Sequence, residues 1–475
     1  MAEAAEPAPA LTPANANRWY VLMTLYGEQT GEEIDRELHE RNRAAWNAWS
    51  GQGMGDEERE AAAKSSYVPV AELAAWPEMK SEVEQRHKAE MLLRNGEDFV
   101  YPGLPSVNAP LNLQRLRFDH AVAMWSMVVA TNAYFGNATF TKALWFTYAT
   151  FSNAAHFNAA TISGDATFIG AFFSKTAEFP GAKFCGEVDF SSATFKGDAL
   201  FICTAFGGTA RFTKAIFHGH TKFVHARVGG DAFFRSATFK GHFWCKSVAF
   251  SGSVHFNHAI FAAAGQDKVV QITDCQFLNP ASFRDANFHS LYPDFSGTIL
   301  HEKTTFTADD THWPKTVSDP LAAIASCAVI RHNLGKQGLP EAEHFFYRRE
   351  MAFGKEIGGF WDKLPFRLYD WLSEYGHSIE RPFWWLIWLW LVPGLVFAAK
   401  GVTGVALADL GVLGRGLALS FADMFSFLGL QRAFFEADLG GMGWALQVLA
   451  GFQTVMGFVF LFLLGLGLRI RFRLR

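Results

Sequence analysis

The sequence predicts a mainly β protein, in which a four-sided β-helix (solenoid) lies between an α-helical head and an α-helical connector, with transmembrane helices at the C-terminus. Three observations support this fold class. Phe recurs at alternating intervals of five and six residues from about residue 113 to 306, and a fixed period indicates a repeat architecture. Charged helical patterns flank the repeat, and two long uncharged runs follow it.

Composition sets broad limits on the protein. The 475 residues are enough for about two to four domains, and the net charge of -4 gives no overall polyelectrolyte signal. Residues 1–100 are acidic, with 10 Lys+Arg against 19 Asp+Glu, whereas residues 113–306 are mildly basic, with 16 against 12. The five cysteines form no CxxC motif, which is typical of a reducing compartment. The N-terminus lacks the basic start and apolar run of a signal peptide.

Residues 1–17 are rich in Ala and Pro, and we expect them to form a disordered tail. Residues 18–110 are expected to form the acidic α-helical head, with helices at about 31–49, from about 56, and at 70–95. Because a solenoid exposes sheet edges and core at its ends, the head is expected to cap the first coil. A head that binds a partner protein is the alternative.

The repeat, residues 111–308, can be built from its own side chains. In a strand, residues i and i−2 face the same side, so each Phe and the small residue two before it both point inward. One 11-residue unit makes two sides, and two units close a coil of 22 residues. The ladder starts at Leu113 and gives 28 positions to Phe261, or seven coils. Positions 22 apart, such as Phe168, Phe190 and Phe212, are expected to stack.

From residue 135 to 261 the ladder has 24 positions, of which 21 are Phe and the others Ile162, Val228 and Cys245. We expect an inserted loop near residues 262–268, recovery of the register at Phe283 and Phe288, and fraying through Phe306. The predicted core ladder consists of Phe135, Phe140, Phe146, Phe151, Phe157, Phe168, Phe173, Phe179, Phe184, Phe190, Phe195, Phe201, Phe206, Phe212, Phe217, Phe223, Phe234, Phe239, Phe250, Phe256 and Phe261.

The repeat unit resembles that of the pentapeptide-repeat family, A-x-F/L-x-x, with a bulky centre and a small residue two before it. Phe168 with Ala166 and Phe239 with Ala237 fit this pattern. The resemblance implies a right-handed quadrilateral parallel β-helix. This chain uses one residue more per two sides than the commonest form, as in a longer-spaced, Phe-rich variant. Residues 319–381 are expected to form the helical connector, and similar helices follow the repeats of membrane-bound relatives.

Residues 382–475 are interpreted as a membrane domain. The run 383–399 has 17 uncharged residues with Trp near its start, which suits a short span with an interfacial belt. A buried core helix is the alternative. The run 443–468 has 26 uncharged residues and is a second predicted span.

Basic residues predict the orientation of these spans, because cytoplasmic flanks are enriched in Lys and Arg. The flanks of the two spans contain more Lys and Arg residues than the loop between the spans does. We therefore expect a bacterial inner-membrane protein with both termini and the β-helix in the cytoplasm. The flanks contain Lys363, Arg367, Arg381, Arg469, Arg471, Arg473 and Arg475, and the loop contains Lys400, Arg415 and Arg432.

Residues 415–429 are apolar but short, so they could be a third span, an interfacial helix or a re-entrant helix. The layout resembles the pore module of two-span cation channels. The place of the ion filter reads Phe427 to Gln431, FLGLQ, without the T-x-G-Y-G type of sequence, so a non-conducting remnant is expected. Ala450, Thr454 and Gly457 share one face of the last helix, which suits close packing on the first span or on another subunit.

No motif points to catalysis, because GxSxG, P-loop and GxGxxG patterns are absent from the sequence. His220 and His242 are 22 residues apart and are expected to stack on an outer face. Two E-x-x-H pairs, at Glu84 and Glu341, have the spacing of di-iron bundles, but no further ligands can be identified. We therefore expect no catalytic, cofactor or metal site.

The sequence is thus interpreted as a non-enzymatic, membrane-anchored scaffold for protein partners. Its expected partners are the lipid bilayer and an unidentified protein, with further copies of the chain as an alternative, but not nucleic acid. The first alternative is a channel-like or mechanosensory oligomer with the β-helix as regulatory domain. The second, a DNA mimic that binds a topoisomerase, is disfavoured by the mildly basic repeat.

Overall fold

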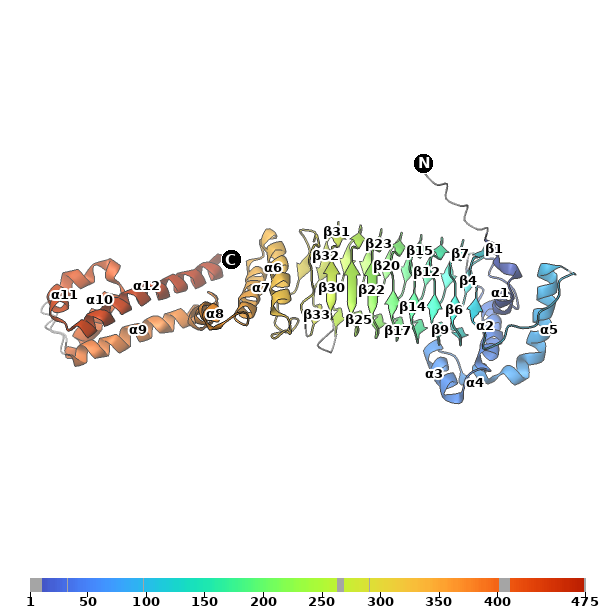
Figure 1. Cartoon of the computed structure of the whole chain (residues 1–475), viewed down its shortest axis with the longest axis horizontal. Helices are drawn as coiled ribbons and strands as arrows, with labels where there is room; N and C mark the ends of the chain where they lie inside the picture. The colour runs from blue at the N-terminus through green and yellow to red at the C-terminus, as the bar shows by residue number, and fades with distance from the viewer. Residues whose placement is uncertain are drawn as a thin grey trace, which may run out of the picture. The chain divides into compact units, whose positions relative to one another are not determined.

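The computed structural model describes residues 11–473, apart from residues 32, 97, 263–268, 290 and 401–410. The chain forms two compact units, Met1–Gln337 and Gly338–Arg475 (Figure 1). The first contains the helical head and a long stack of short strands. The second is entirely helical in its described part.

The strands of the first unit form a parallel β-solenoid, which confirms the predicted fold class. Within the described residues they make four parallel sheets (Figure 1). Successive strands of a sheet are four positions apart in the chain, except that β1 pairs with β3 and β32 pairs with β34. The first sheet holds, in order, β1 (Thr12–Pro13), β3 (Leu116–Phe118), β7 (Thr139–Phe140), β11 (Thr161–Ile162), β15 (Lys183–Phe184), β19 (Ala205–Phe206), β23 (Arg227–Val228), β27 (Ala249–Phe250) and β31 (Gln276–Phe277). The second sheet holds, in order, β2 (Leu111–Asn112), β6 (Ala133–Tyr134), β10 (Ala155–His156), β14 (Ala177–Glu178), β18 (Ala199–Leu200), β22 (Thr221–Val224), β26 (Phe243–Lys246) and β30 (Val270–Thr273).

The other two sheets complete each coil. They hold β4 (Val122–Ala123), β8 (Leu144–Trp145), β12 (Ala166–Thr167), β16 (Val188–Asp189), β20 (Ala210–Arg211), β24 (Ala232–Phe233), β28 (Val254–His255), β32 (Ala281–Phe283) and β34 (Thr305–Phe306); and β5 (Val128–Val129), β9 (Thr150–Phe151), β13 (Phe172–Phe173), β17 (Thr194–Phe195), β21 (Ile216–Phe217), β25 (Thr238–Phe239), β29 (Ile260–Phe261) and β33 (Asn287–Phe288).

The Phe ladder forms the core of the solenoid. All 21 ladder Phe side chains are at most 2% exposed. Rings 22 residues apart lie nearly parallel: the centroids of Phe168 and Phe190 are 4.5 Å apart, and those of Phe190 and Phe212 are 5.1 Å apart. Each such pair contributes about 0.5–1.5 kcal/mol beyond the burial of its apolar area.

The 11-residue unit is explained by a turn at every second corner. In one of them, Ala160 N–H donates to Phe157 O across a four-residue turn, and Ala159 takes a left-handed φ of 54°. Such residues recur every 11 positions from Arg115 to His258, and most are not Gly. The hydrogen-bonding ladder between coils thus holds many corners in a conformation that L residues ordinarily avoid.

The ladder continues past the predicted irregularity. Phe250 pairs with Phe277, so this coil takes five residues more than the others. The inserted loop that the sequence predicts near 262–268 lies outside the described residues, except for Ala262. The predicted fraying is confirmed in part. Asp294 and Ile299 make only isolated bridges to the preceding coil, whereas β34 pairs with β32 and the rings of Phe283 and Phe306 lie 5.0 Å apart.

The head covers the first coil. It contains η1 (Ala14–Ala16), α1 (Arg18–Met23), α2 (Arg36–Gly51), α3 (Asp56–Ser66), α4 (Val70–Ala74) and α5 (Trp76–Asn95). The prediction of a disordered tail to residue 17 is wrong for residues 12–17. Thr12 and Pro13 pair with β3, and Asn17 accepts hydrogen bonds from the first N–H groups of α1. Residues 1–10 lie outside the described part.

At the other end of the solenoid, α6 (Pro320–Lys336) lies on the last coil. Asn333 Nδ2 donates to His301 O at 3.1 Å, and Gln337 Nε2 donates to Thr304 O at 2.7 Å. The chain divides after Gln337, so the predicted connector 319–381 is not one module. Its first helix belongs to the solenoid unit and the rest to the helical unit.

The helical unit contains α7 (Pro340–Gly354), α8 (Phe360–Ser373), α9 (Glu380–Ala399), α10 (Val412–Met424), η3 (Ser426–Leu428), α11 (Leu430–Gly441) and α12 (Trp444–Arg473). Helices α9, α10 and α12 pack against one another (Figure 1). Among the described residues, two helices are long and apolar enough to cross a membrane, at Glu380–Ala399 and Trp444–Phe472. Only 28% of each apolar window is buried, which argues against buried core helices.

Candidate functional site

The edge of the solenoid is closed by the head. Val128 lies in β5, the terminal strand of its sheet, and a terminal strand leaves backbone groups unpaired. Trp46 Nε1 donates to Val128 O, and Val128 N–H donates to Asn47 Oδ1, both at 2.8 Å. These contacts from α2 satisfy the exposed strand, which supports capping as the role of the head.

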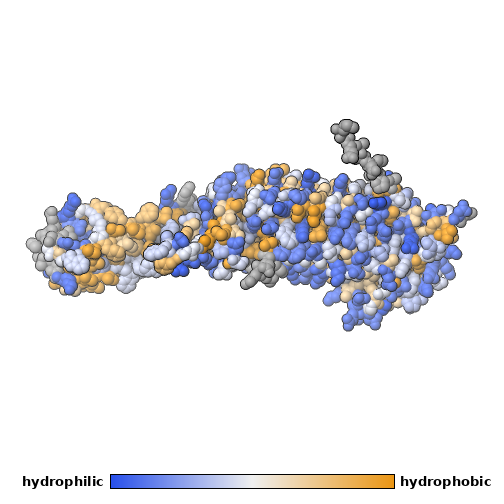
Figure 2. All heavy atoms as spheres, viewed as in Figure 1, coloured by the Kyte–Doolittle hydropathy of each residue, from blue (hydrophilic) through white to orange (hydrophobic). Residues whose placement is uncertain are grey.

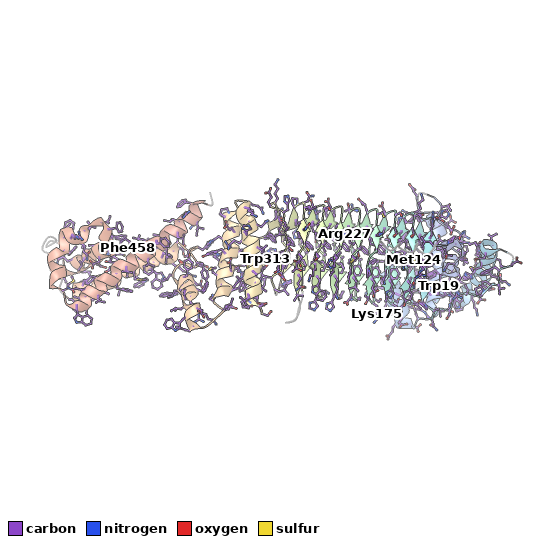
Figure 3. All side chains as sticks on the ribbon, turned by 45° about the horizontal axis from the view of Figure 1, so that its top comes forward. Trp19, Met124, Lys175, Arg227, Trp313 and Phe458 are labelled. Atoms are coloured by element: carbon purple, nitrogen blue, oxygen red, sulfur yellow. The ribbon has the colours of Figure 1, made fainter. Side chains whose placement is uncertain are left out.

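A cleft of about 490 Å³ lies between α3 and the first coils. Its lining combines Glu58 and Ser65 of the helix side with Thr150, Asn153 and Lys175 of the solenoid side. Lys175 lies at the solenoid surface (Figure 3). Glu58 accepts a hydrogen bond from Gly55 N–H, and Ser65 Oγ bonds Thr150 Oγ1, so these groups already serve the fold.

The outer faces of the solenoid carry mixed polar and apolar side chains (Figure 2). The rings of His220 and His242 have centroids 4.5 Å apart but are tilted by 37°, whereas His242 stacks on Trp244 at 4.7 Å. Lys222 Nζ lies 4.7 Å from the centroid of the Trp244 ring. The Nδ1 atoms of the two His rings accept hydrogen bonds from backbone N–H groups of the next coil. This cluster is an aromatic, basic surface patch.

The E-x-x-H pairs do not form metal sites. The ring nitrogens of His87 lie 2.9 Å from Tyr101 Oη and from Arg18 O, and burial lowers its pKa. His344 stacks on His377 with centroids 5.4 Å apart. Burial, and then the charges of His377 and Arg348, lower the pKa of His344 to about 4. Within the described residues, no group of three or more His, Cys, Asp or Glu side chains could hold a metal ion.

The predicted small-residue face of the last helix packs on α10, a helix that the sequence analysis did not consider as its neighbour. Thr454 Oγ1 donates to Asp423 O at 2.9 Å. A Cβ at Gly457 would lie 2.6 Å from Met424 O, so only Gly fits there. Ala450 is buried in the same contact region. The face is therefore used within the chain.

Sequence reasoning missed a polar cluster in this region. Gln453 Nε2 donates to Leu389 O at 3.0 Å and to Ser420 O at 2.8 Å, while Ser420 Oγ donates to Trp390 O at 2.6 Å. Asp423 is fully buried, and its Oδ1 accepts a hydrogen bond from Gln431. The cluster ties α9, α10 and α12 together. The only sequence signal was the presence of these polar side chains in otherwise apolar segments.

The arginines predicted to set membrane orientation lie at the ends of the two apolar helices. Arg381 is in the first turn of α9, and its Nη1 donates to Asp370 O at 2.8 Å. Arg469 and Arg471 lie near the C-terminal end of α12, and Arg473 is its last residue. Arg475 lies outside the described residues.

The four parallel sheets and the inward Phe ladder define the first unit as a β-solenoid. Residues 135–183 and 179–227 match the protein-family model described as Pentapeptide repeats (9 copies). Residues 135–227 thus consist of pentapeptide repeats, as the resemblance of the repeat unit implied. Searches of curated proteins and of solved structures found no match.

Proposed function

We propose that this chain is a non-enzymatic scaffold, anchored in a membrane, that presents its pentapeptide-repeat solenoid to protein partners. The observation that carries the proposal is the combination of a solenoid whose ladder side chains all serve its core with two apolar helices that remain largely uncovered. Hydrophobic residues are more abundant over the helical unit than over the solenoid (Figure 2). An uncovered apolar surface of this size favours a lipid environment.

The proposed location is a bacterial inner membrane. The basic residues at the ends of α9 and α12 support an orientation with both termini and the solenoid in the cytoplasm. The outer patch of His220, Lys222, His242 and Trp244 is the surface most suited to a protein partner. Trp side chains are enriched where proteins bind one another.

Site-specific photo-crosslinking in membranes tests the scaffold. A photoreactive residue at Trp244 is expected to crosslink a partner protein, and the charge reversal Lys222→Glu should reduce the yield. The same probe at Tyr134, an outward position on a coil near the head, is the matched control. Absence of any crosslinked protein at Trp244 would contradict the proposal.

A second candidate is a channel-like oligomer, and its support is that α10 lies between α9 and α12 as a dipping helix would. The structure at the position of an ion filter argues against the channel-like oligomer. Residues 426–428 form η3 and residues 430–441 form α11, so no extended segment follows α10 before residue 441. Ring-shaped particles of four or more chains that conduct in planar bilayers would favour this candidate over the scaffold.

A further inference from the structure

Helix α8 has an aromatic face that the described part of its own unit leaves largely exposed. Phe360, Trp361, Leu368 and Trp371 are 63%, 78%, 45% and 57% exposed. At 100° per residue these four positions fall within an arc of about 100° of the helix surface. Large apolar side chains gathered on one face indicate a surface that a partner covers.

The opposite face of α8 is fixed by the protein. Phe366 lies against Gly354 of α7, and Lys355 Nζ pairs with Asp370 Oδ2 at 3.1 Å. Tyr369 and Leu372 pack into the core between α9 and α12. The helix therefore cannot turn to bury its aromatic face without losing these contacts.

Helix α8 lies where both apolar helices end. Trp371 contacts Trp385 of α9 with ring centroids 4.4 Å apart, near the start of that helix. On α12, Gly467 lies close to Ile379, because a Cβ added to this glycine would be 3.2 Å from the Ile379 side chain. Gly467 is two residues before Arg469, the residue that ends the uncharged run. If α9 and α12 cross a membrane, α8 lies at its surface.

The composition of α8 and its surroundings fits a lipid interface. Trp residues concentrate where membrane meets water, and Trp384, near the start of α9, is also exposed. Lys363 and Arg367 lie beside the apolar arc, which is the arrangement of interfacial helices that bind anionic lipids.

We infer that α8 lies in the plane of an anionic membrane surface, with Phe360, Trp361, Leu368 and Trp371 in the acyl–headgroup region and Lys363 and Arg367 at lipid phosphates. This inference rests on the proposed membrane anchoring and adds a lipid-binding surface to it. The partner is the phosphate-bearing bilayer surface, not a protein groove.

Fluorine NMR on the full chain tests this inference. The protein is labelled with 5-fluorotryptophan and placed in nanodiscs of phosphatidylethanolamine and phosphatidylglycerol, and the Trp361 resonance is assigned by its loss in Trp361→Phe. A lipid carrying a nitroxide near its headgroup is expected to broaden the Trp361 resonance. Buried Trp19 of the head, assigned in the same way, should stay sharp.

Trp388, exposed on α9, separates the two proposals. If the nitroxide lipid broadens Trp388 but leaves Trp361 sharp, the spans are inserted and the inference about α8 is overturned. If neither resonance broadens, the membrane anchoring itself is contradicted, and the inference falls with it. Protection of Trp361 from both nitroxide lipid and a water-soluble paramagnetic chelate would mean that protein covers α8, which also overturns the inference.

A charge variant tests the anionic part of the surface. Lys363→Glu with Arg367→Glu should remove most of the nitroxide broadening of Trp361 in these nanodiscs. Neither side chain takes part in the contacts that hold the inner face of α8, so the fold is expected to persist. Unchanged broadening in this variant would overturn the role assigned to the two basic residues.

Discussion

At the scale of single residues, the solenoid corners hold L residues in a left-handed conformation. Ala159 has a φ of 54° and an exposed side chain, so it gains nothing from its methyl group. Ala159→Gly is expected to stabilise the solenoid by about 0.5–1 kcal/mol, because relief of the left-handed penalty exceeds the entropy cost of Gly. Thermal unfolding of the full chain measures this change. Ala160→Gly, at the fully buried neighbour, should instead lower the midpoint, and the same sign for both variants would contradict the account.

Two adjacent Phe residues separate core from surface. Phe173 is fully buried and stacks on Phe151 and Phe195, with centroids 5.1 and 4.8 Å away. Phe172 points outward from the same strand. Phe173→Ala is expected to destabilise the solenoid by about 3–5 kcal/mol, through lost burial and the cavity that remains. Phe172→Ala should cost much less in the same denaturant titration. Equal losses would contradict the inward ladder.

His344 predicts a pH dependence for the helical unit. Its imidazole has a pKa of about 4 in the fold, below the ordinary value of 6.5, chiefly because of burial. The unfolded chain therefore takes up this proton first, and stability is expected to fall as the pH falls from 6.5 to about 4. Thermal unfolding in detergent at several pH values measures the slope.

His344→Phe keeps an aromatic ring beside His377 and should flatten that slope. Burial also lowers the pKa of His377, so a weaker dependence of the same sign should remain. A variant with the full slope of the parent would show that another group is responsible.

At the scale of elements, the contact between α12 and α10 depends on a glycine. Because a Cβ at Gly457 would meet Met424 O, Gly457→Val is expected to push the two helices apart and lower the thermal midpoint of the helical unit. Gly451→Val on the same helix is the matched control, since its added Cβ would meet nothing within 4 Å. Size-exclusion chromatography after heating in detergent reports both. Equal behaviour of the two variants would contradict the packing.

The elements also show what the sequence could predict. The period of five and six residues identified the ladder, because each Phe in it serves one repeated contact. The hydrogen bonds that Val128 accepts from Trp46 and donates to Asn47 could not be found this way, since they join residues about 80 positions apart without any period. The hydrogen-bonded cluster around Gln453 could not be predicted from the sequence for the same reason. Its side chains form their hydrogen bonds only once α10 is packed against α9 and α12.

At the scale of the whole molecule, the solenoid and the helical unit differ in how they use their apolar side chains. The ladder side chains of the solenoid form its own core, and its outer faces are the surfaces proposed to bind partners. The helical unit uses Ser420 and Gln453 to hold three helices together, while most of the surface of α9 and α12 stays apolar. This division is the basis of the proposed membrane-anchored scaffold.

Two native cysteines allow the most direct test of the central claim. Cys185 and Cys203 are exposed on the solenoid, whereas Cys245, Cys275 and Cys327 are buried. In bacterial spheroplasts that express the full chain, a membrane-impermeant maleimide should label the protein only after the inner membrane is opened. The Cys185→Ser, Cys203→Ser double variant should then stay unlabelled, and the chain should remain in the membrane pellet after alkaline extraction. Labelling in intact spheroplasts, or release into the alkaline supernatant, would contradict the account.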